Sequence, residues 1–351
     1  MVEWLAGNRI IGNTAEDPML LGGWKEVART TLGSNTSTLD VSSLPNKKYY
    51  MILSYYNLTG AGNPYLRLNG DTGTKYDLRH NMDGSESSGV SNTDRGFYGA
   101  VSGTNSLPYF EVNYFANEAN KVKLGIGFTT HQNTAGASNP AHKTERAMKY
   151  VNTSDPITSV NYWSQNGVGS FASGSECVVL GYDPDDVHGG DNFWQPLASV
   201  ELDSTASEID TGEFTPKKYL MVQGFAHAVG ATDIVLEFNG SNSGYTRRNN
   251  ANGTEASGVA NQSHADIGYG IGSNSHNKFF NSFIFNKSDK EKLVTSIAMH
   301  SGGTGSGQTT ARNNSATKWT NTTEQINRIK FQAIDSTGFG SGTTLKVWGH
   351  D

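Results

Sequence analysis

The sequence predicts an all-β protein made of two tandem, homologous antiparallel β-sandwich domains of jelly-roll type, preceded by a distinct N-terminal arm. Three observations lead to this prediction. The composition suits strands and tight turns, with 15 Tyr, 15 Phe and 41 Gly among 351 residues. Apolar and aromatic runs of strand length alternate with segments rich in turn-forming residues. The second half of the chain repeats the first at a nearly constant offset.

The repeat covers almost the whole chain after the arm. "KKYYMIL" at Lys47–Leu53 matches "KKYLMVQ" at Lys217–Gln223 with a shift of 170 positions. "YDLRHNMDGSESSGVSN" at Tyr76–Asn92 matches "YTRRNNANGTEASGVAN" at Tyr245–Asn261 with a shift of 169. Near the end of the chain the shift is 168. Because chance similarity would not keep this register, the chain contains two copies of one domain.

The repeat divides the chain into four segments. We predict an arm at residues 1–22, a first sandwich at 23–182, a linker at 183–191 and a second sandwich at 192–351. The linker lies within "YDPDDVHGGDN", where Pro, paired Gly and several Asp are typical of an exposed connection.

Each copy is predicted to contain about eight to ten short strands. Their number and their regular spacing along the chain are those expected of a sandwich. Tyr49–Tyr56 and Tyr219–Ala226 are aromatic and aliphatic runs of strand length. Asn69–Gly70 and Asn239–Gly240 follow alternating strands and are predicted to be hairpin turns. The segment with most helical character, Asn139–Val151, is expected to form no more than one helical turn.

The polar phrase that occurs twice carries a common set of residues. The retained residues are Tyr76, Arg79, Gly84, Glu86, Tyr245, Arg248, Gly253 and Glu255. One interpretation is a ligand loop in which the arginine and the carboxylate hold a sugar or a partner. The other is a hairpin in which they pair across the strands, with glycine at a positive φ. We favour the hairpin, because residues that both copies retain are those that the fold needs. Positions that differ between the copies, such as His80 and Asn249, are where each copy would contact a partner of its own.

The motifs of several enzyme classes are missing, so we predict a protein that is not an enzyme. The sequence has no Gly-x-Ser-x-Gly elbow, Walker loop or His-Glu-x-x-His motif. A glycosidase needs two facing carboxylates. Glu111 and Glu237 are in strands, but their counterparts in the other copy are Phe280 and Arg67, so no shared pair is implied.

Charge and cysteine content exclude other classes. A net charge of −6 and a pI of about 5.9 argue against nucleic acid as a partner. The chain has no run of 18 apolar residues, so we expect no membrane insertion. We also expect no secretory signal, and the single Cys177 excludes a disulfide framework within the chain. Synthesis in a reducing cytoplasm fits both observations.

No cofactor is expected. If a metal binds, the Asp183–Asp191 linker is the place for Ca²⁺, although a solvated linker is favoured. Its candidate ligands are Asp183, Asp185, Asp186, His188 and Asp191. His131 and His300 occupy equivalent strand ends and are expected to be structural. The aromatic pairs Tyr109–Phe110 and Phe279–Phe280 each place one ring away from the core, as a sugar platform or under a neighbouring subunit.

The arm has apolar residues but no counterpart in the repeat. These residues are Trp4, Leu5, Ile10, Ile11, Met19, Leu20 and Leu21. Apolar side chains outside a domain need a partner surface. We therefore expect residues 1–22 to dock onto another subunit.

Five features together resemble virion surface proteins of tailed viruses, especially marine phages. They are the arm "EWLAGNRIIG", the following "GW", the "KKYLM" strand, the "NGD" turn and the closing "GS…L.G" strand. The resemblance implies a structural protein of the particle surface, as a capsid decoration, fibre or tail component. Its partners would be other virion proteins, including further copies of itself, and it would be made in the host cytoplasm. A carbohydrate-binding receptor-recognition module or adhesin, with a host-surface glycan as ligand, is the alternative.

Overall fold

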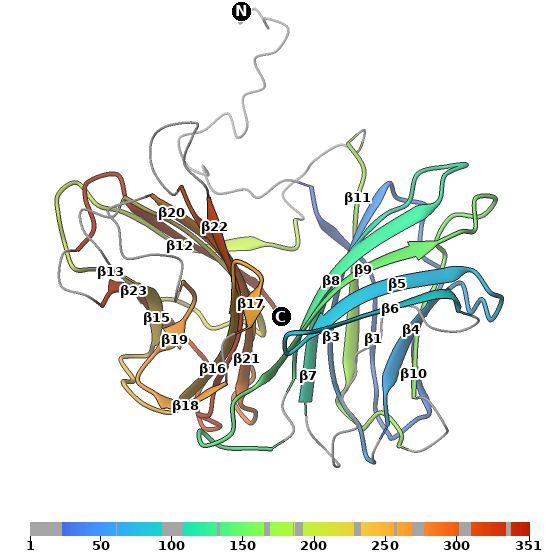
Figure 1. The fold of residues 1–351 in the computed structure, drawn as a ribbon, viewed down its shortest axis with the longest axis horizontal. Coiled ribbons are helices and arrows are strands. Elements are labelled where there is room, and N and C mark those ends of the chain that lie inside the picture. The colour runs from blue at the N-terminus through green and yellow to red at the C-terminus, as the bar shows by residue number, and fades with distance from the viewer. Residues whose placement is uncertain are drawn as a thin grey trace, which may run out of the picture.

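The computed structural model is all-β and antiparallel throughout the residues that it describes. These are residues 23–60, 62–92, 108–131, 134–164, 169–184, 186, 192–227, 233–255, 258–268, 277–301, 310–334 and 338–351. They form 24 strands, and no helix is present among them. The prediction of two tandem antiparallel sandwiches is confirmed (Figure 1). No helix long and apolar enough to span a membrane occurs in these ranges.

Copy 1 has a large and a small sheet. Its strands are β1 (Lys25–Thr31), β2 (Thr38–Val41), β3 (Tyr49–Asn57), β4 (Pro64–Leu68), β5 (Tyr76–Met82), β6 (Ser85–Asn92), β7 (Pro108–Ala116), β8 (Lys123–His131), β9 (His142–Tyr150), β10 (Val160–Ser164) and β11 (Glu176–Tyr182). The large sheet has the order β1-β11-β3-β7-β8-β9-β5-β6, and the small sheet β2-β10-β4. The segment with most helical character contains β9, because its backbone pairs with β8 on one side and with β5 on the other.

Copy 2 repeats this arrangement with more short strands. Its strands are β12 (Gln195–Glu201), β13 (Glu208–Glu213), β14 (Tyr219–Ala226), β15 (Ile234–Phe238), β16 (Tyr245–Ala251), β17 (Thr254–Glu255), β18 (Val259–Gln262), β19 (Ala265–Asp266), β20 (Lys278–Phe285), β21 (Lys292–His300), β22 (Ala311–Trp319), β23 (Arg328–Ala333) and β24 (Thr344–His350). The large sheet has the order β12-β24-β14-β20-β21-β22-β16-β17, with β18 also on β16, and the small sheet β13-β23-β15-β19. The described residues thus hold 11 and 13 strands, more than the predicted eight to ten, because short pieces pair within the connections.

The core of each copy lies between its large and small sheets. It is filled by every second side chain of the strands, because successive side chains point to opposite faces of a sheet. Along β3, Tyr50 and Ile52 point into the core of copy 1. The intervening Met51, Leu53 and Tyr55 point the other way, yet they are also buried. A strand buried on both faces needs a second covering layer, which the other copy provides.

The two Asn-Gly dipeptides form turns, but these turns are not hairpins. Asn69 and Gly70 have φ of 58° and 60°, and Asn239 and Gly240 have φ of 53° and 72°. Each turn carries the chain from the small sheet to the large one, from β4 to β5 and from β15 to β16. The asparagine is retained because its side chain also binds a neighbouring loop: Asn69 Nδ2 donates to the Pro156 carbonyl at 2.8 Å.

The outer faces of the two large sheets pack together as a third core. Tyr55 stacks on Phe285 with ring centroids 3.6 Å apart, and Phe110 lies 6.1 Å from the same ring. Tyr219 and Trp194 of copy 2 are fully buried in this cluster. The cluster is made of buried apolar and aromatic side chains from both copies, as in the interior of a domain.

Glu176 fixes one side of this contact. Its carboxylate accepts hydrogen bonds from Tyr219 Oη and Thr31 Oγ1, both at 2.6 Å. Lys218 Nζ lies 3.1 Å away and Arg29 Nη1 3.5 Å away. Burial alone would raise the pKa of Glu176, but these hydrogen bonds and positive charges outweigh it and lower the pKa. Glu176 is therefore held as a carboxylate between the copies.

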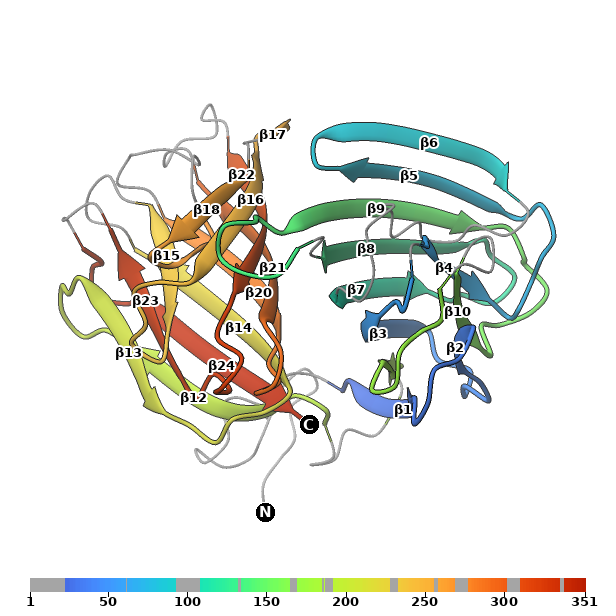
Figure 2. The same ribbon diagram turned by 90° about the horizontal axis from the view of Figure 1, so that it is seen from below.

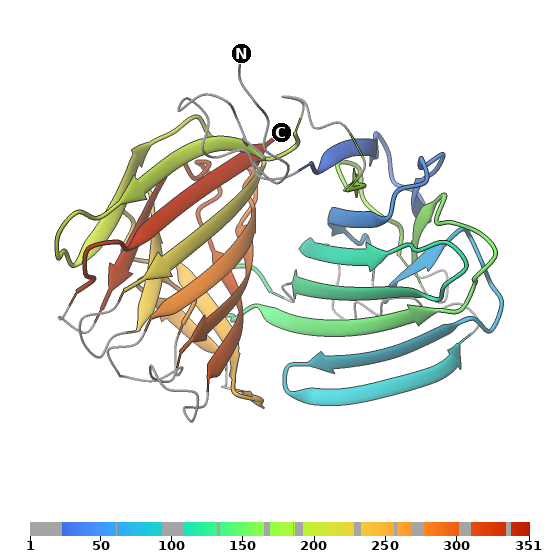
Figure 3. The ribbon, with the colours of Figure 1, turned by 90° about the horizontal axis from the view of Figure 1, so that it is seen from above.

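Three views show how the copies meet. In Figure 1, β20–β22 of copy 2 face β7–β9 of copy 1. Figure 2 shows the connection between β8 and β9 reaching copy 2 beside β21, where Gly136 N donates to Glu291 at 2.7 Å. Figure 3 shows the C-terminus beside β1, where Arg29 Nη2 donates to the Asp351 carbonyl at 2.6 Å. Contacts far apart along the sheets thus fix one copy against the other.

Candidate functional site

The first occurrence of the duplicated phrase is a hairpin of β5 and β6. Its turn contains Asp83 and Gly84, with φ of 48° and 87°. Arg79 Nη1 lies 2.7 Å from Glu86 Oε1 across the two strands, and both side chains are exposed. An exposed pair of this kind contributes little stability, so it leaves both groups available to a ligand.

The second occurrence has the same turn but a different arginine contact. Gly253 again has a φ of 87°. Arg248, the counterpart of Arg79, crosses to copy 1, where its Nε lies 3.1 Å from Asp83 Oδ1 and donates to the Ala141 carbonyl at 3.1 Å. The side chain of Glu255 lies outside the described part of the structure. The turn of one hairpin therefore contacts the arginine of the other, which the sequence comparison did not predict.

The two tyrosines of the phrase are buried and belong to the cores. Tyr76 Oη donates to the Leu68 carbonyl at 3.0 Å, and its ring stacks on Tyr150 at 4.9 Å. Tyr245 stacks on Trp319 at 6.0 Å. These residues hold each phrase on its large sheet and are inaccessible to a ligand.

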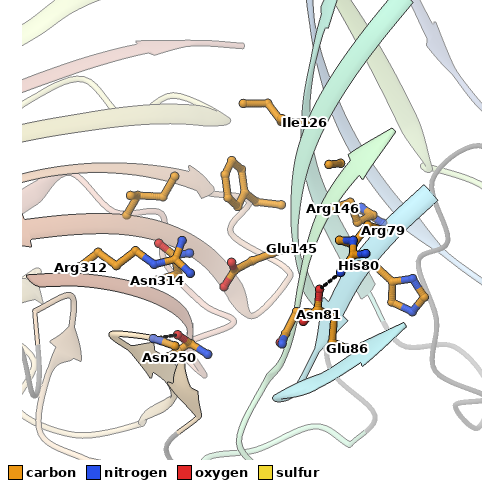
Figure 4. Close-up of a pocket in the computed structure, with 14 residues that line it drawn as sticks. Arg79, His80, Asn81, Glu86, Ile126, Glu145, Arg146, Asn250, Arg312 and Asn314 are labelled. Atoms are coloured by element: carbon orange, nitrogen blue, oxygen red, sulfur yellow. Dashed lines mark hydrogen bonds and ion pairs between the residues drawn. The ribbon is translucent and has the colours of Figure 1, made fainter. Parts of the chain in front are cut away.

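Both phrases border a cleft of about 470 Å³ between the copies (Figure 4). Its lining residues are Arg79, His80, Asn81, Glu86, Ile126, Phe128, Glu145, Arg146, Ala147, Asn250, Gly253, Ile297, Arg312 and Asn314. Copy 1 contributes side chains from β5, β6, β8 and β9, and copy 2 from the β16–β17 hairpin, β21 and β22. The cleft exists only because the two copies pack at this angle.

The cleft combines an apolar part with donors and acceptors. Ile126, Phe128 and Ile297 supply aliphatic and aromatic surface from β8 and β21. Figure 4 shows Glu145 between the copies, with Arg312 and Asn314 opposite it. Such a mixture can orient a polar ligand through hydrogen bonds while its apolar face lies on the side chains.

Two groups in the cleft are open to a ligand. The side chain of the exposed Arg312 has no partner in the part of the chain that the structure describes. Asn314 is 5% exposed, and its side-chain oxygen lacks a hydrogen-bond partner among the described residues. By contrast, Glu145 is engaged by Lys143 Nζ at 2.6 Å. Copy 2 therefore adds these two groups to the exposed Arg79–Glu86 pair of copy 1.

Behind the cleft, Asp83 joins a histidine stack. One carboxylate oxygen of Asp83 is hydrogen-bonded to His142 Nδ1, and the other accepts from Lys143 N at 2.9 Å. Burial would raise the pKa of Asp83, but these bonds and the charge of Arg248 lower it. His142 stacks on His131 with centroids 5.1 Å apart. The arrangement holds Asp83 charged at the contact between the copies.

His131 is neutral and enclosed. It is 1% exposed and stacks on Tyr109 at 4.9 Å. Burial is the main cause that lowers the pKa of His131 to about 3, and a charge on His142 acts in the same direction. Neither ring nitrogen of His131 has a hydrogen-bond partner among the described residues. These observations fit the structural role expected from the sequence.

Copy 1 also contains a buried polar network around Glu111. The carboxylate accepts from Tyr56 Oη at 2.7 Å, Tyr162 Oη at 3.2 Å and Asn113 Nδ2 at 3.2 Å, and Arg146 lies 3.4 Å away. Both charged side chains are almost completely inaccessible. Glu111 therefore cannot reach a substrate and acts as an internal partner for Arg146, which also lines the cleft.

The aromatic pairs divide as alternation requires. Tyr109 and Phe280 lie in the cores of copies 1 and 2. Phe110 faces outwards and is covered by copy 2 of the same chain, and not by a separate subunit. Its counterpart Phe279 is 45% exposed.

The remaining predicted sites lie partly outside the described residues. All seven apolar arm residues are outside them, as are Asp185, His188 and Asp191 of the linker. Asp186 receives Lys47 Nζ at 2.6 Å, so its carboxylate has a cationic partner. Within the described ranges no three His, Cys, Asp or Glu side chains form a group that could hold a metal ion.

Sequence reasoning missed Asp83, Arg312 and Asn314. Asp83 had a signal, because Asp-Gly is a strong hairpin dipeptide. Arg312 and Asn314 alternate along β22 and so share one face of the sheet. Nothing in the sequence indicated that this face borders copy 1.

Comparisons with known proteins give distant likenesses only. No protein-family model matches the chain, and no curated protein matches it. Domains LG4-5 of the mouse laminin alpha1 chain are 10% identical, over 93% of this chain and 90% of that chain, with a TM-score of 0.19. The Sputnik virophage structure is 8% identical, over 99% and 90%, with a TM-score of 0.13. Neisserial surface protein A is 5% identical, over 82% and 99%, with a TM-score of 0.13. At such TM-scores these likenesses carry no argument about function.

Proposed function

We propose that the protein is a non-enzymatic structural protein of a virus particle surface, as a capsid decoration or tail or fibre component, which acts through protein–protein contacts. The observation that carries the assembly role is an exposed apolar row on the large sheet of copy 2. Phe225, Phe279 and Met299 are cross-strand neighbours on β14, β20 and β21. They are 38%, 45% and 42% exposed. Adjacent exposed apolar side chains mark a surface that binds another protein.

The particle location rests on the sequence resemblance, and the N-terminal arm provides its test. Deleting residues 1–22 should leave two folded sandwiches, because the cores of both copies are built from later residues. The shortened protein should be lost from purified particles, since the apolar arm would be its attachment. Mass spectrometry of particles assembled with either form measures this directly. Circular dichroism of the shortened protein checks that it remains folded, and its normal incorporation would refute the role of the arm.

The cleft between the copies supports a second function, recognition of a host-surface glycan. Sugars bind through hydroxyl groups that need donors and acceptors and through an apolar ring face that needs a hydrocarbon or aromatic surface. Arg312 supplies donors, the side-chain oxygen of Asn314 and the carboxylate of Glu86 supply acceptors, and Phe128 and Ile297 supply the apolar surface. The guanidinium of Arg312, which has no partner among the described residues, favours a glycan that carries a carboxylate or sulfate.

Replacing Arg312 with alanine should weaken glycan binding about tenfold or more, because a hydrogen bond to a charged group contributes about 1.5–3 kcal/mol. A glycan array identifies ligands retained by the full chain, and calorimetry then compares the variant with the wild type. Lys330→Ala is the matched control, since Lys330 lies on β23 in the small sheet and pairs with Glu208 at 3.2 Å. Equal affinity of the Arg312 variant, or retention of no glycan at all, would rule out this use of the cleft.

A further inference from the structure

The two copies use different surfaces in their mutual contact, although their strands are equivalent. Strand registers match: Tyr55 is opposite Phe110 and Phe110 opposite Thr130, just as Phe225 is opposite Phe279 and Phe279 opposite Met299. We call each set of three the outer row of its copy. Phe110 is 1% exposed and Phe279 45%. The outer row of copy 1 is therefore covered, whereas that of copy 2 is open.

A definite surface of copy 2 covers the outer row of copy 1. Tyr219, Phe285 and Leu293, which we call the cover face, lie on neighbouring strands. Phe110 lies 6.1 Å from Phe285 and 6.4 Å from Tyr219, and Thr130 Oγ1 donates to the Val294 carbonyl at 2.9 Å. Leu293 is completely buried there.

Copy 1 has the equivalent cover face, which stays partly exposed in the described structure although Tyr182 stacks on Tyr49 at 6.1 Å. Tyr49, Ala116 and Leu124 are cross-strand neighbours in the register of Tyr219, Phe285 and Leu293. Leu124 is 57% exposed, and Tyr49 is 37% exposed. The three residues line a hollow of about 280 Å³ that Trp24 and Tyr114 complete.

Within the described ranges, the outer row of copy 2 and the cover face of copy 1 are therefore both left open. We propose that a second copy of this chain docks here, with its cover face on the outer row of the first, so that the contact within the chain is repeated between chains. A contact that joins two different surfaces is heterologous and forms a closed ring or an extended array. This proposal deepens the assembly role above and rests on it.

The details of the two surfaces agree with this pairing. Ala116 stands where copy 2 has Phe285, so the hollow of copy 1 has the space that an incoming Phe225 or Phe279 ring needs. The ion pair of the internal contact has no equivalent, because Thr344 on β24 takes the position of Glu176 beside Phe225. The contact between chains should therefore be weaker than the internal one and largely insensitive to salt.

Two single-face variants test the proposal in the full chain. Wild-type protein should form species of at least twice the chain mass in a dilution series followed by analytical ultracentrifugation. Phe279→Asp should remove association through the outer row, and Leu124→Asp should remove it through the cover face. Both positions are exposed, so both variants should fold. Phe279→Ala should weaken association about tenfold or more, as expected for an aromatic anchor.

Mixing the two variants decides the type of contact. Each variant alone should be a single chain, whereas the mixture should give a pair of one Leu124→Asp and one Phe279→Asp chain, because one intact row and one intact cover face remain. Val90→Asp, at an exposed position of β6, is the control and should associate like the wild type.

Three results would overturn the proposal: a wild-type chain that stays single, a Leu124→Asp chain that still self-associates, or a mixture without pairs. The N-terminal arm is the other segment that could cover these two surfaces, and deletion of residues 1–22 distinguishes it from a second chain. Association that persists without the arm supports the proposal, and association lost with the arm assigns the contact to the arm. A single wild-type chain that is still incorporated into particles would refute the self-association and leave the proposed function standing.

Discussion

Replacing His131 with phenylalanine is expected to stabilise the protein, and increasingly so in acid. At neutral pH the gain should be about 1 kcal/mol, because the neutral imidazole has two ring nitrogens without hydrogen-bond partners among the described residues. A phenyl ring keeps the stack between Tyr109 and His142. Below a pH of about 6.5 the difference should grow by about 1.4 kcal/mol for each pH unit.

The wild type loses stability in acid because its unfolded chain binds a proton at His131 more readily than the folded protein does. Burial first, and then the charge of His142, lower the pKa of His131 in the folded protein to about 3, whereas a histidine in an unfolded chain has a pKa of about 6.5. Between these values the unfolded chain binds a proton that the folded protein does not. The wild type therefore has its full stability above a pH of about 6.5 and loses it progressively as the pH falls towards 3.

Urea unfolding followed by tryptophan fluorescence, repeated from pH 7 down to about 4, measures the effect. The difference between variant and wild type isolates His131 from the carboxylates that titrate in the same range. His227→Phe, at an exposed histidine, is the control and should keep the wild-type profile. Parallel profiles for the His131 variant and the wild type would show that His131 is protonated in the folded protein.

Replacing Glu111 with alanine is expected to destabilise copy 1 by about 3–5 kcal/mol. The substitution leaves the fully buried guanidinium of Arg146 without its carboxylate, and loss of one partner of a buried ion pair costs about that much. Tyr56 and Tyr162 lose their acceptor at the same time. Copy 2 has Phe280 in place of Glu111 and Phe331 in place of Tyr162, with ring centroids 5.0 Å apart. The fold thus accepts either a complete polar network or an apolar cluster at this position.

The single cysteine reports on copy 1 alone. Burial raises the pKa of Cys177 to about 12, so the thiol should react with an alkylating reagent only when the core of copy 1 opens. The labelling rate in urea should therefore rise strongly in Glu111→Ala. Glu237→Ala, at a strand position near Lys330 in copy 2, is the control and should lose no more than about 1 kcal/mol. A labelling rate unchanged by Glu111→Ala would show that Arg146 finds another partner.

Local features of the chain were predictable where local physics decides them. Positive φ at Gly84 and Gly253 follows from the freedom of glycine, and these turns hold both copies of the phrase. The Asn-Gly turns were also predicted, but their role as hairpins was wrong. A dipeptide fixes the turn geometry but not which sheet receives the next strand.

The arginines of the phrase show where prediction from the repeat ends. Arg79 pairs with Glu86 inside its own hairpin, whereas Arg248 pairs with Asp83 of the other copy. Both arginines occupy the same position in the repeat. Their contacts differ because the copies do not meet symmetrically, so Arg248 lies beside copy 1 while Arg79 borders the open cleft.

The sequence by itself determined the all-β class, the duplication and the residues that each copy needs for its own core, because strand alternation and turn chemistry act over a few residues. Only the tertiary structure decided which of two equivalent surfaces is buried. Phe110 and Phe279 have the same place in the repeat, yet one is covered and the other open. Their difference arises from the offset between two packed sheets, which depends on many side chains far apart in the chain and appears in no local pattern.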